Sequence, residues 1–266
     1  MSQAGYAATS KKPSASPQDD LLSAQDALQS EANAVVSALG LDRTLRALGD
    51  PVRTGSSALG LMAVRDIDIT VVCARLDAVA RQAVLRLGAE LGGHPRVREV
   101  TFRNDTGRWN AEPTAYPDGL YLRVLYRADD APEGARNEDA PEGARNEGAP
   151  ENARNEDAPQ GAPDGNAPQG ASADDGADGP QGEWNLDIWF VDEPERQPDL
   201  AHLRSLPPRL TQEARIAILR IKRHLVRSGR YGRDVRSFAV YRAVLDGGVR
   251  TPDEFEQWRE TDDRQE

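Results

Sequence analysis

The chain has only one cysteine, Cys73, and three histidines among its 266 residues. A single cysteine excludes a disulfide within the chain, and its place after an apolar run is typical of a small core residue. The histidines are isolated in the sequence, without the spacing of metal ligands, so we expect none of them to bind zinc. These are His94, His202 and His224.

Long apolar runs are also lacking. No stretch approaches the length that crosses a bilayer, and the first 20 residues lack the apolar core of a secretory signal peptide. The absence of a cysteine framework agrees with a reducing compartment. We therefore expect a cytoplasmic protein without a membrane partner.

An excess of basic residues is lacking, and the net charge of −11 is unevenly spread. Residues 129–182 hold 14 acidic residues and three arginines, whereas the rest of the chain holds 30 acidic and 30 basic residues. A generic nucleic-acid binder is expected to carry a basic stripe. The neutral remainder therefore predicts no generic binding to nucleic acid.

Residues 129–182 repeat nine-residue units such as APEGARNED, APEGARNEG and APENARNED. They contain no Leu, Ile, Val, Phe, Tyr, Trp or Met, so they have nothing to pack. We expect a disordered acidic insertion that joins two strands of one sheet, and a second disordered segment over 1–19. Each doubling of a loop costs only about 0.6 kcal/mol, so such an insertion need not unfold its domain.

Hydrophobic periodicity predicts alternating helices and strands in the rest of the chain. Helices are expected over 21–39, 41–48, 57–62, 76–91, 214–225 and 238–247, and a capping box opens a last one at 252. Strands are expected over 51–54, 66–72, 97–102, 120–126 and 184–191. The helix over 76–91 has Val79, Ala83, Leu85 and Leu87 as its apolar positions, and Lys222 is expected off the apolar face of its own helix.

Two aspartates, Asp66 and Asp68, interrupt an otherwise apolar strand. Residues i and i+2 of a strand point to the same side, so they form a carboxylate pair while Ile67 and Ile69 face a core. Aspartate is disfavoured in strands, and adjacent carboxylates repel each other unless a cation lies between them. Hard oxygen ligands suit Mg²⁺ together with substrate phosphates. A magnesium site is therefore favoured over the alternative, a solvated strand face.

A turn at Gly55-Ser56 stands nine residues before the pair, and Asp187 lies on a later predicted strand. This order resembles the nucleotidyltransferase superfamily, whose pattern is a Gly-Ser turn, an Asp-x-Asp strand and a third carboxylate on a later strand. Asp187 follows Asp68 by 119 positions, of which 54 belong to residues 129–182. The insertion therefore accounts for most of an unusually long separation.

The resemblance implies an α+β fold with a small mixed sheet flanked by helices. It assigns a core to 20–128 and 183–206, and a C-terminal helical segment to 207–266. It further implies that Asp66, Asp68 and Asp187 hold two Mg²⁺ ions and are catalytic. The residues that it assigns to the triphosphate, ATP by default, are Gly55, Ser56, Ser57 and Arg65.

The implied reaction moves a nucleotidyl group, AMP by default, onto a hydroxyl and releases pyrophosphate. The leading hypothesis is a small-molecule acceptor, as in antibiotic-inactivating adenylyltransferases. A second possibility is a protein or RNA acceptor, as in antitoxin-type members. A third is a noncatalytic nucleotide-binding regulatory protein that retains the fold.

Overall fold

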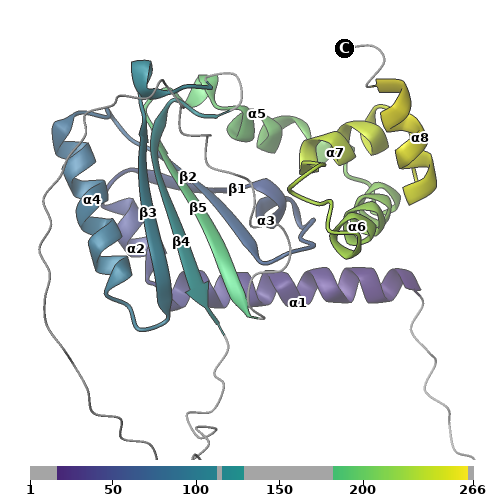
Figure 1. The fold of residues 1–266 in the computed structure, drawn as a ribbon, viewed down its shortest axis with the longest axis horizontal. Coiled ribbons are helices and arrows are strands. Elements are labelled where there is room, and N and C mark those ends of the chain that lie inside the picture. Colours follow the sequence, from purple (N-terminus) through teal and green to yellow (C-terminus); the bar gives the residue numbers. More distant parts are fainter. Residues whose placement is uncertain (1–16, 113–115, 129–181, 263–266) are drawn as a thin grey trace, which may run out of the picture. The chain divides into compact units, whose positions relative to one another are not determined.

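The computed structural model describes residues 17–112, 116–128 and 182–262, all of which belong to one compact unit. A mixed sheet of five strands is flanked by helices, which confirms the α+β class (Figure 1). The expected acidic insertion over 129–182 and the expected tail over 1–19 lie almost wholly outside the described residues.

The elements follow one another along the chain much as the periodicity predicts. The strands are β1 (Asp50–Thr54), β2 (Asp66–Val72), β3 (Val97–Asp105), β4 (Gly119–Arg127) and β5 (Glu183–Val191). The helices are α1 (Pro17–Ala38), α2 (Leu41–Arg46), α3 (Gly55–Leu59), α4 (Ala78–Gly92), α5 (Pro198–Ser205), α6 (Gln212–Arg227), α7 (Ser237–Leu245) and α8 (Pro252–Asp262). Short 3-10 turns are η1 (Gly107–Trp109), η2 (Pro194–Arg196) and η3 (Pro207–Arg209).

The strands lie in the order β1-β2-β5-β4-β3. The β2–β5 pair is parallel, and the other three pairs are antiparallel. Strands β4 and β5, which flank the acidic insertion, are antiparallel neighbours, and the Ala128 amide donates to the Gly182 carbonyl at 3.0 Å. The insertion therefore joins two adjacent strands of one sheet, as the sequence predicts.

One face of the sheet forms an apolar core with α1, α2 and α4. In β2, Ile67 and Val71 are completely buried, and in β5 Leu186 and Ile188 are as well. Because successive side chains alternate between the two faces of a strand, the aspartates of both strands lie on the opposite face. The core thus fixes where the polar groups of the sheet are presented.

A second apolar cluster is formed by α6, α7 and α8 together with Leu59 and Leu61, which end and follow α3. Lys222 of α6 lies within it and is completely buried, so its expected place off the apolar face is wrong. Its Nζ donates to the Leu61 carbonyl at 2.7 Å, and lies 5.2 Å and 5.5 Å from the ring centroids of Tyr231 and Tyr241. A buried ammonium is tolerated because these groups replace its water.

Two helices differ from their expected limits or faces. Helix α1 begins at Pro17, so residues 17–19 are helical rather than part of a tail. Proline is favoured at the first helical position, where its missing N–H costs nothing.

In α4, Val79 and Leu85 are 70% and 40% exposed, and the buried side is formed by Val84, Leu87 and Leu91. Apolar residues occur on both sides of α4, so composition alone misplaces its core face.

Helix α5 is not predicted by the sequence pattern. It is short, with eight residues, and buries only Leu200. Among the described helices, none is long and apolar enough to span a bilayer.

Candidate functional site

Three carboxylates meet on the polar face of the sheet. Parallel pairing of β2 with β5 places Asp68 directly opposite Asp187, and Asp66 opposite Asn185. One oxygen from each of Asp66, Asp68 and Asp187 lies within 4.8 Å of the others. The predicted convergence of these three residues, which are far apart in the sequence, is therefore confirmed.

Burial and mutual repulsion make these carboxylates costly to ionise. Burial, then the charge of Asp187, raises the pKa of Asp66 from 3.8 to about 7. Burial, then the charges of Asp66 and Asp187, raises the pKa of Asp68 well above its ordinary value. The pKa of Asp187 is also raised, chiefly by burial. A bound cation would remove this penalty because it favours the ionised forms.

The Gly55 turn lies against the carboxylate cluster. Thr54, the last residue of β1, pairs with Asp68, and Gly55 then turns the chain with a φ of +59°. A β-carbon at Gly55 would lie 1.9 Å from Oδ2 of Asp68. Both the left-handed backbone and this close approach require glycine.

Ser56 and Ser57, the serines that follow, are buried, with exposures of 6% and 4%. The Ser57 hydroxyl donates to the Thr54 carbonyl at 3.3 Å, so it holds the turn itself. The Ser56 hydroxyl has no such intramolecular contact among the described residues. Of the two serines, Ser56 is therefore the better candidate to meet a ligand.

Arg65 has a different partner from the one that the resemblance implies. It immediately precedes β2, and its Nε donates to Oε2 of Glu31 on α1 at 3.2 Å. The described contacts of Arg65 thus join β2 to α1, and none of them is to the carboxylate cluster. Its expected contact with phosphate stays a prediction that the structure does not support.

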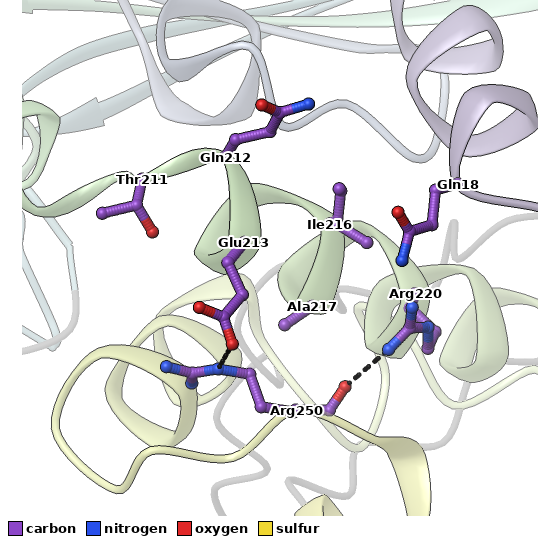
Figure 2. A pocket seen from close by; sticks show the side chains of 8 residues that line it. All are labelled: Gln18, Thr211, Gln212, Glu213, Ile216, Ala217, Arg220 and Arg250. Carbon is purple, nitrogen blue, oxygen red and sulfur yellow. Dashed lines mark hydrogen bonds and ion pairs between the residues drawn. The ribbon is translucent and has the colours of Figure 1, made fainter.

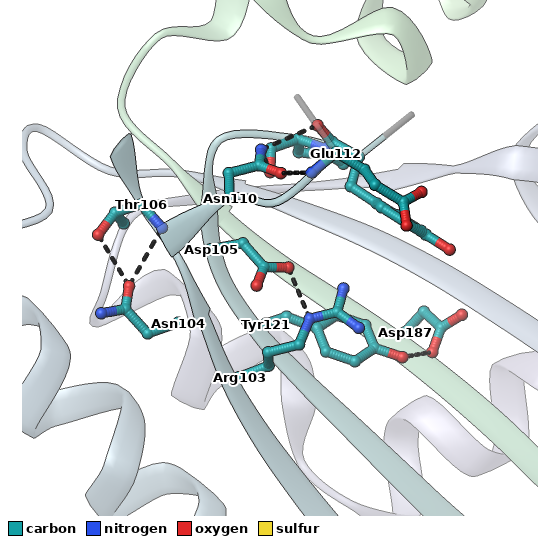
Figure 3. A network of polar contacts seen from close by, with 10 residues as sticks. Arg103, Asn104, Asp105, Thr106, Asn110, Glu112, Tyr121 and Asp187 are labelled. Carbon is teal, nitrogen blue, oxygen red and sulfur yellow. Dashed lines mark hydrogen bonds and ion pairs between the residues drawn. The ribbon is translucent and has the colours of Figure 1, made fainter. Parts of the chain in front are cut away.

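Polar residues on β4 and β5 surround the carboxylates. Asn185 donates to Oδ1 of Asp66 at 2.9 Å and accepts from Nε of Arg123 at 2.8 Å. The Tyr121 hydroxyl donates to Oδ1 of Asp187 at 2.5 Å (Figure 3). Alternation places Asn185 on the same face as Asp187, but the sequence does not reveal that Tyr121 and Arg123 on another strand join them.

Lys222 is a further residue that the sequence analysis missed. Burial lowers its pKa to about 7, while the charges of Asp66 and Asp68 act in the opposite direction. It is the only lysine after Lys12 in an arginine-rich chain. That scarcity is a signal that could have singled it out, because lysine supplies a compact charge that burial readily perturbs.

A separate hollow lies beside α6, lined by residues of α1, α6 and the segment before α8 (Figure 2). Its arginines already have partners: Arg250 Nε donates to Glu213 Oε1 at 3.2 Å, and an Arg220 nitrogen donates to the Arg250 carbonyl at 3.0 Å. The hollow contains none of the three clustered aspartates. It therefore offers no comparable chemistry.

Comparisons with known proteins add nothing to this geometry. No model of a known protein family matches the chain, and no curated protein matches it. The site is therefore interpreted from its own contacts and from the resemblance of its Gly-Ser turn and three aspartates to the nucleotidyltransferase pattern.

Proposed function

We propose that the chain is a magnesium-dependent nucleotidyltransferase that moves AMP from ATP onto a hydroxyl acceptor. The observation that carries this proposal is the convergence of Asp66, Asp68 and Asp187, with oxygens within 4.8 Å of one another. A noncatalytic protein has no need for three half-buried carboxylates that repel one another. Their position beside a glycine turn favours an enzyme.

The donor set fits Mg²⁺. All three groups offer hard oxygen atoms, and their raised pKa values indicate that the cluster lacks a sufficient counter-charge of its own. Asp66, Asp68 and Asp187 would hold the metal. When bound, magnesium would neutralise charge on the triphosphate and lower the pKa of the acceptor hydroxyl.

The Gly55 turn would bind the triphosphate. Its backbone can approach a ligand closely because there is no β-carbon. The Ser56 hydroxyl has no hydrogen-bond partner among the described residues. Successive backbone amides in such a turn form a concave site for anions. Lys222, whose charge acts on Asp66 and Asp68, would add positive potential on this side of the site.

The acceptor hydroxyl would approach from the side of Asp187. Its oxygen would form the new bond to the α-phosphorus while its proton passes to Asp187 or to water. The bond from this phosphorus to the bridging oxygen would break, and pyrophosphate would leave. Tyr121 holds Asp187 in one orientation through its hydroxyl. The residues of the chain thus contribute mainly positioning and electrostatic stabilisation.

The direct test is incubation with α-labelled nucleoside triphosphates, Mg²⁺, a panel of hydroxyl acceptors and a cell extract. We expect pyrophosphate release that depends on Mg²⁺ and falls roughly 100-fold or more in Asp68→Asn, as when an essential electrostatic contact is lost. Asp77→Asn is the matched control, because Asp77 caps α4 and asparagine caps a helix equally well.

Equal pyrophosphate release by wild type and Asp68→Asn would exclude the enzyme and leave the noncatalytic alternative. Transfer of label to a small molecule supports the proposal as stated. Transfer to a protein or an RNA in the extract would instead assign the acceptor to the antitoxin-type class.

A further inference from the structure

A cluster of arginine and aromatic side chains adjoins Asp187 on the side away from the Gly55 turn. We call it the arginine–aromatic cluster; its members are Arg103, Tyr116, Tyr121, Trp189 and Arg236. Trp189 lies two residues after Asp187 on the same face of β5. Its partner on the neighbouring strand β4 is Tyr121. Tyr121 also links the cluster to Asp187 through its hydroxyl (Figure 3).

The guanidinium of Arg103 lies among three aromatic rings. Its Cζ is 4.8 Å from the ring centroid of Tyr121, 5.2 Å from that of Tyr116 and 5.6 Å from that of Trp189. Its Nε donates to Oδ2 of Asp105 at 2.6 Å. The two terminal nitrogens of Arg103 have no hydrogen-bond partner among the described residues, although its side chain is only 28% exposed.

A second cation shares the ring of Tyr116. Cζ of Arg236 lies 5.8 Å from the same centroid that Arg103 approaches at 5.2 Å. Arg236 is exposed and forms no ion pair with any described carboxylate, and Glu112, in the loop drawn in Figure 3, pairs with neither arginine. Two guanidinium groups thus adjoin one ring, and an oxyanion is the ligand that guanidinium donors bind most strongly.

The position of this cluster assigns it to the acceptor. The Gly55 turn lies beside β2 on one side of Asp187, whereas Tyr121 and Arg103 come from β4 and β3 on the other. We propose that the acceptor is an anion whose phosphate or carboxylate group binds Arg103 and Arg236 while its hydroxyl meets Asp187. This inference rests on the proposed function. It argues against a polycationic amino sugar, which the two arginines would repel.

The test measures anion binding with the triphosphate site already filled. The protein is saturated with Mg²⁺ and α,β-methylene-ATP, and is then titrated with inorganic phosphate in one series and with acetate in another, by calorimetry. We expect saturable binding of at least one of the two, weakened about 10-fold in Arg236→Gln, as expected for loss of a charged hydrogen bond. The series that saturates distinguishes a phosphate from a carboxylate acceptor.

Arg233→Gln is the matched control, because Arg233 is exposed on the same segment and pairs with Asp234; it should bind the anion like wild type. Absence of binding in both series, or equal binding by Arg236→Gln and wild type, would overturn the inference. The proposed function is tested separately, before any anion is added. If α,β-methylene-ATP does not bind in the presence of Mg²⁺, the proposed function itself fails. Arg103→Gln is a second variant, with its folding checked by circular dichroism because Asp105 loses its partner.

Discussion

The backbone at Gly55 faces the carboxylate of Asp68 so closely that a β-carbon would lie 1.9 Å from Oδ2. The turn that would bind phosphate and the carboxylate that would bind metal are therefore in direct contact. Any side chain at position 55 must displace Asp68, and with it the oxygen that faces Asp66 and Asp187. This contact ties the shape of the turn to the geometry of the proposed metal site.

Gly55→Ala should therefore abolish nucleotidyl transfer, together with the rise in melting temperature that we expect Mg²⁺ to give the wild-type protein. An alanine held in this left-handed backbone conformation also adds roughly 1–3 kcal/mol of strain, whether or not the site holds a ligand. Gly229→Ala is the matched control, because Gly229 has a φ of +64° but no atom within 4 Å of the point that a β-carbon would occupy. If both variants lose activity equally, strain rather than the displacement of Asp68 explains the loss.

Asp68→Asn should raise the melting temperature of the metal-free protein. Asparagine has the same shape but removes a charge that burial and two neighbouring carboxylates oppose. We expect a rise of roughly 2–4 °C, the effect of about 1 kcal/mol in a domain of this size. The same variant should lose the further rise that Mg²⁺ gives to wild type, which thermal melts with and without the ion will show.

Asp77→Asn is the control for this prediction, because folding favours the charge of Asp77 and opposes that of Asp68. The pKa of Asp77 is lowered, chiefly by the amide of Ala80, so its charge is favoured in the folded state. Its loss should not raise the melting temperature. A metal-free Asp68→Asn protein that melts below wild type would contradict the repulsion argument.

The stability of the metal-free protein should fall as the pH rises from about 4 to about 7, in the window set by the ordinary and raised pKa of Asp66. The folded-state pKa of Asp66 is raised from 3.8 to about 7, so the folded protein binds this proton more tightly than the unfolded chain. The resulting stabilisation is complete below the ordinary value and is lost as the pH rises through the raised one. Lys222, with a pKa lowered to about 7, acts in the opposite direction only above that value.

Chemical denaturation at several pH values measures this slope. Asp66→Asn should flatten it, and Mg²⁺ should stabilise wild type more at pH 8 than at pH 5 because it binds the ionised carboxylates. An unchanged slope in Asp66→Asn would show that other groups dominate the pH dependence.

Tyr121→Phe should lower kcat roughly 10-fold, as expected for a group that orients a proposed metal ligand. The tyrosine hydroxyl donates to Asp187 and so favours its ionised form. Its removal should raise the pKa of Asp187 and move the acid limb of the pH–rate profile upward. Tyr126→Phe, on the buried face of the same strand, should leave both kcat and the profile unchanged.

Much of this site could be predicted from local patterns. The alternation in residues 66–72 and 184–191 predicts two strands, and it places Asp66, Asp68 and Asp187 on the faces opposite their apolar neighbours. That β2 and β5 are adjacent and in register is not a local property. Only the resemblance of the motif order to a known family predicts it.

The remaining contacts depend on how strands and helices pair in space. Tyr121 precedes Leu122 in a pattern typical of any half-buried strand, and only the β4–β5 register brings it to Asp187. Lys222 has the spacing of the apolar face of α6, but its charge suggests exposure; the Leu61 carbonyl that satisfies it lies 161 positions away. The sequence places Val79 on the core face of α4, but it is exposed. A helix with apolar residues on both sides does not reveal which side is covered.

The most direct test of the central claim is a crystal of the protein soaked with Mn²⁺ and α,β-methylene-ATP, with data collected for anomalous scattering. We predict anomalous peaks bound by carboxylate oxygens of Asp66, Asp68 and Asp187, with the triphosphate on the Gly55 turn. Metal bound elsewhere, or a nucleotide bound with Asp187 remote from any ion, would contradict the account.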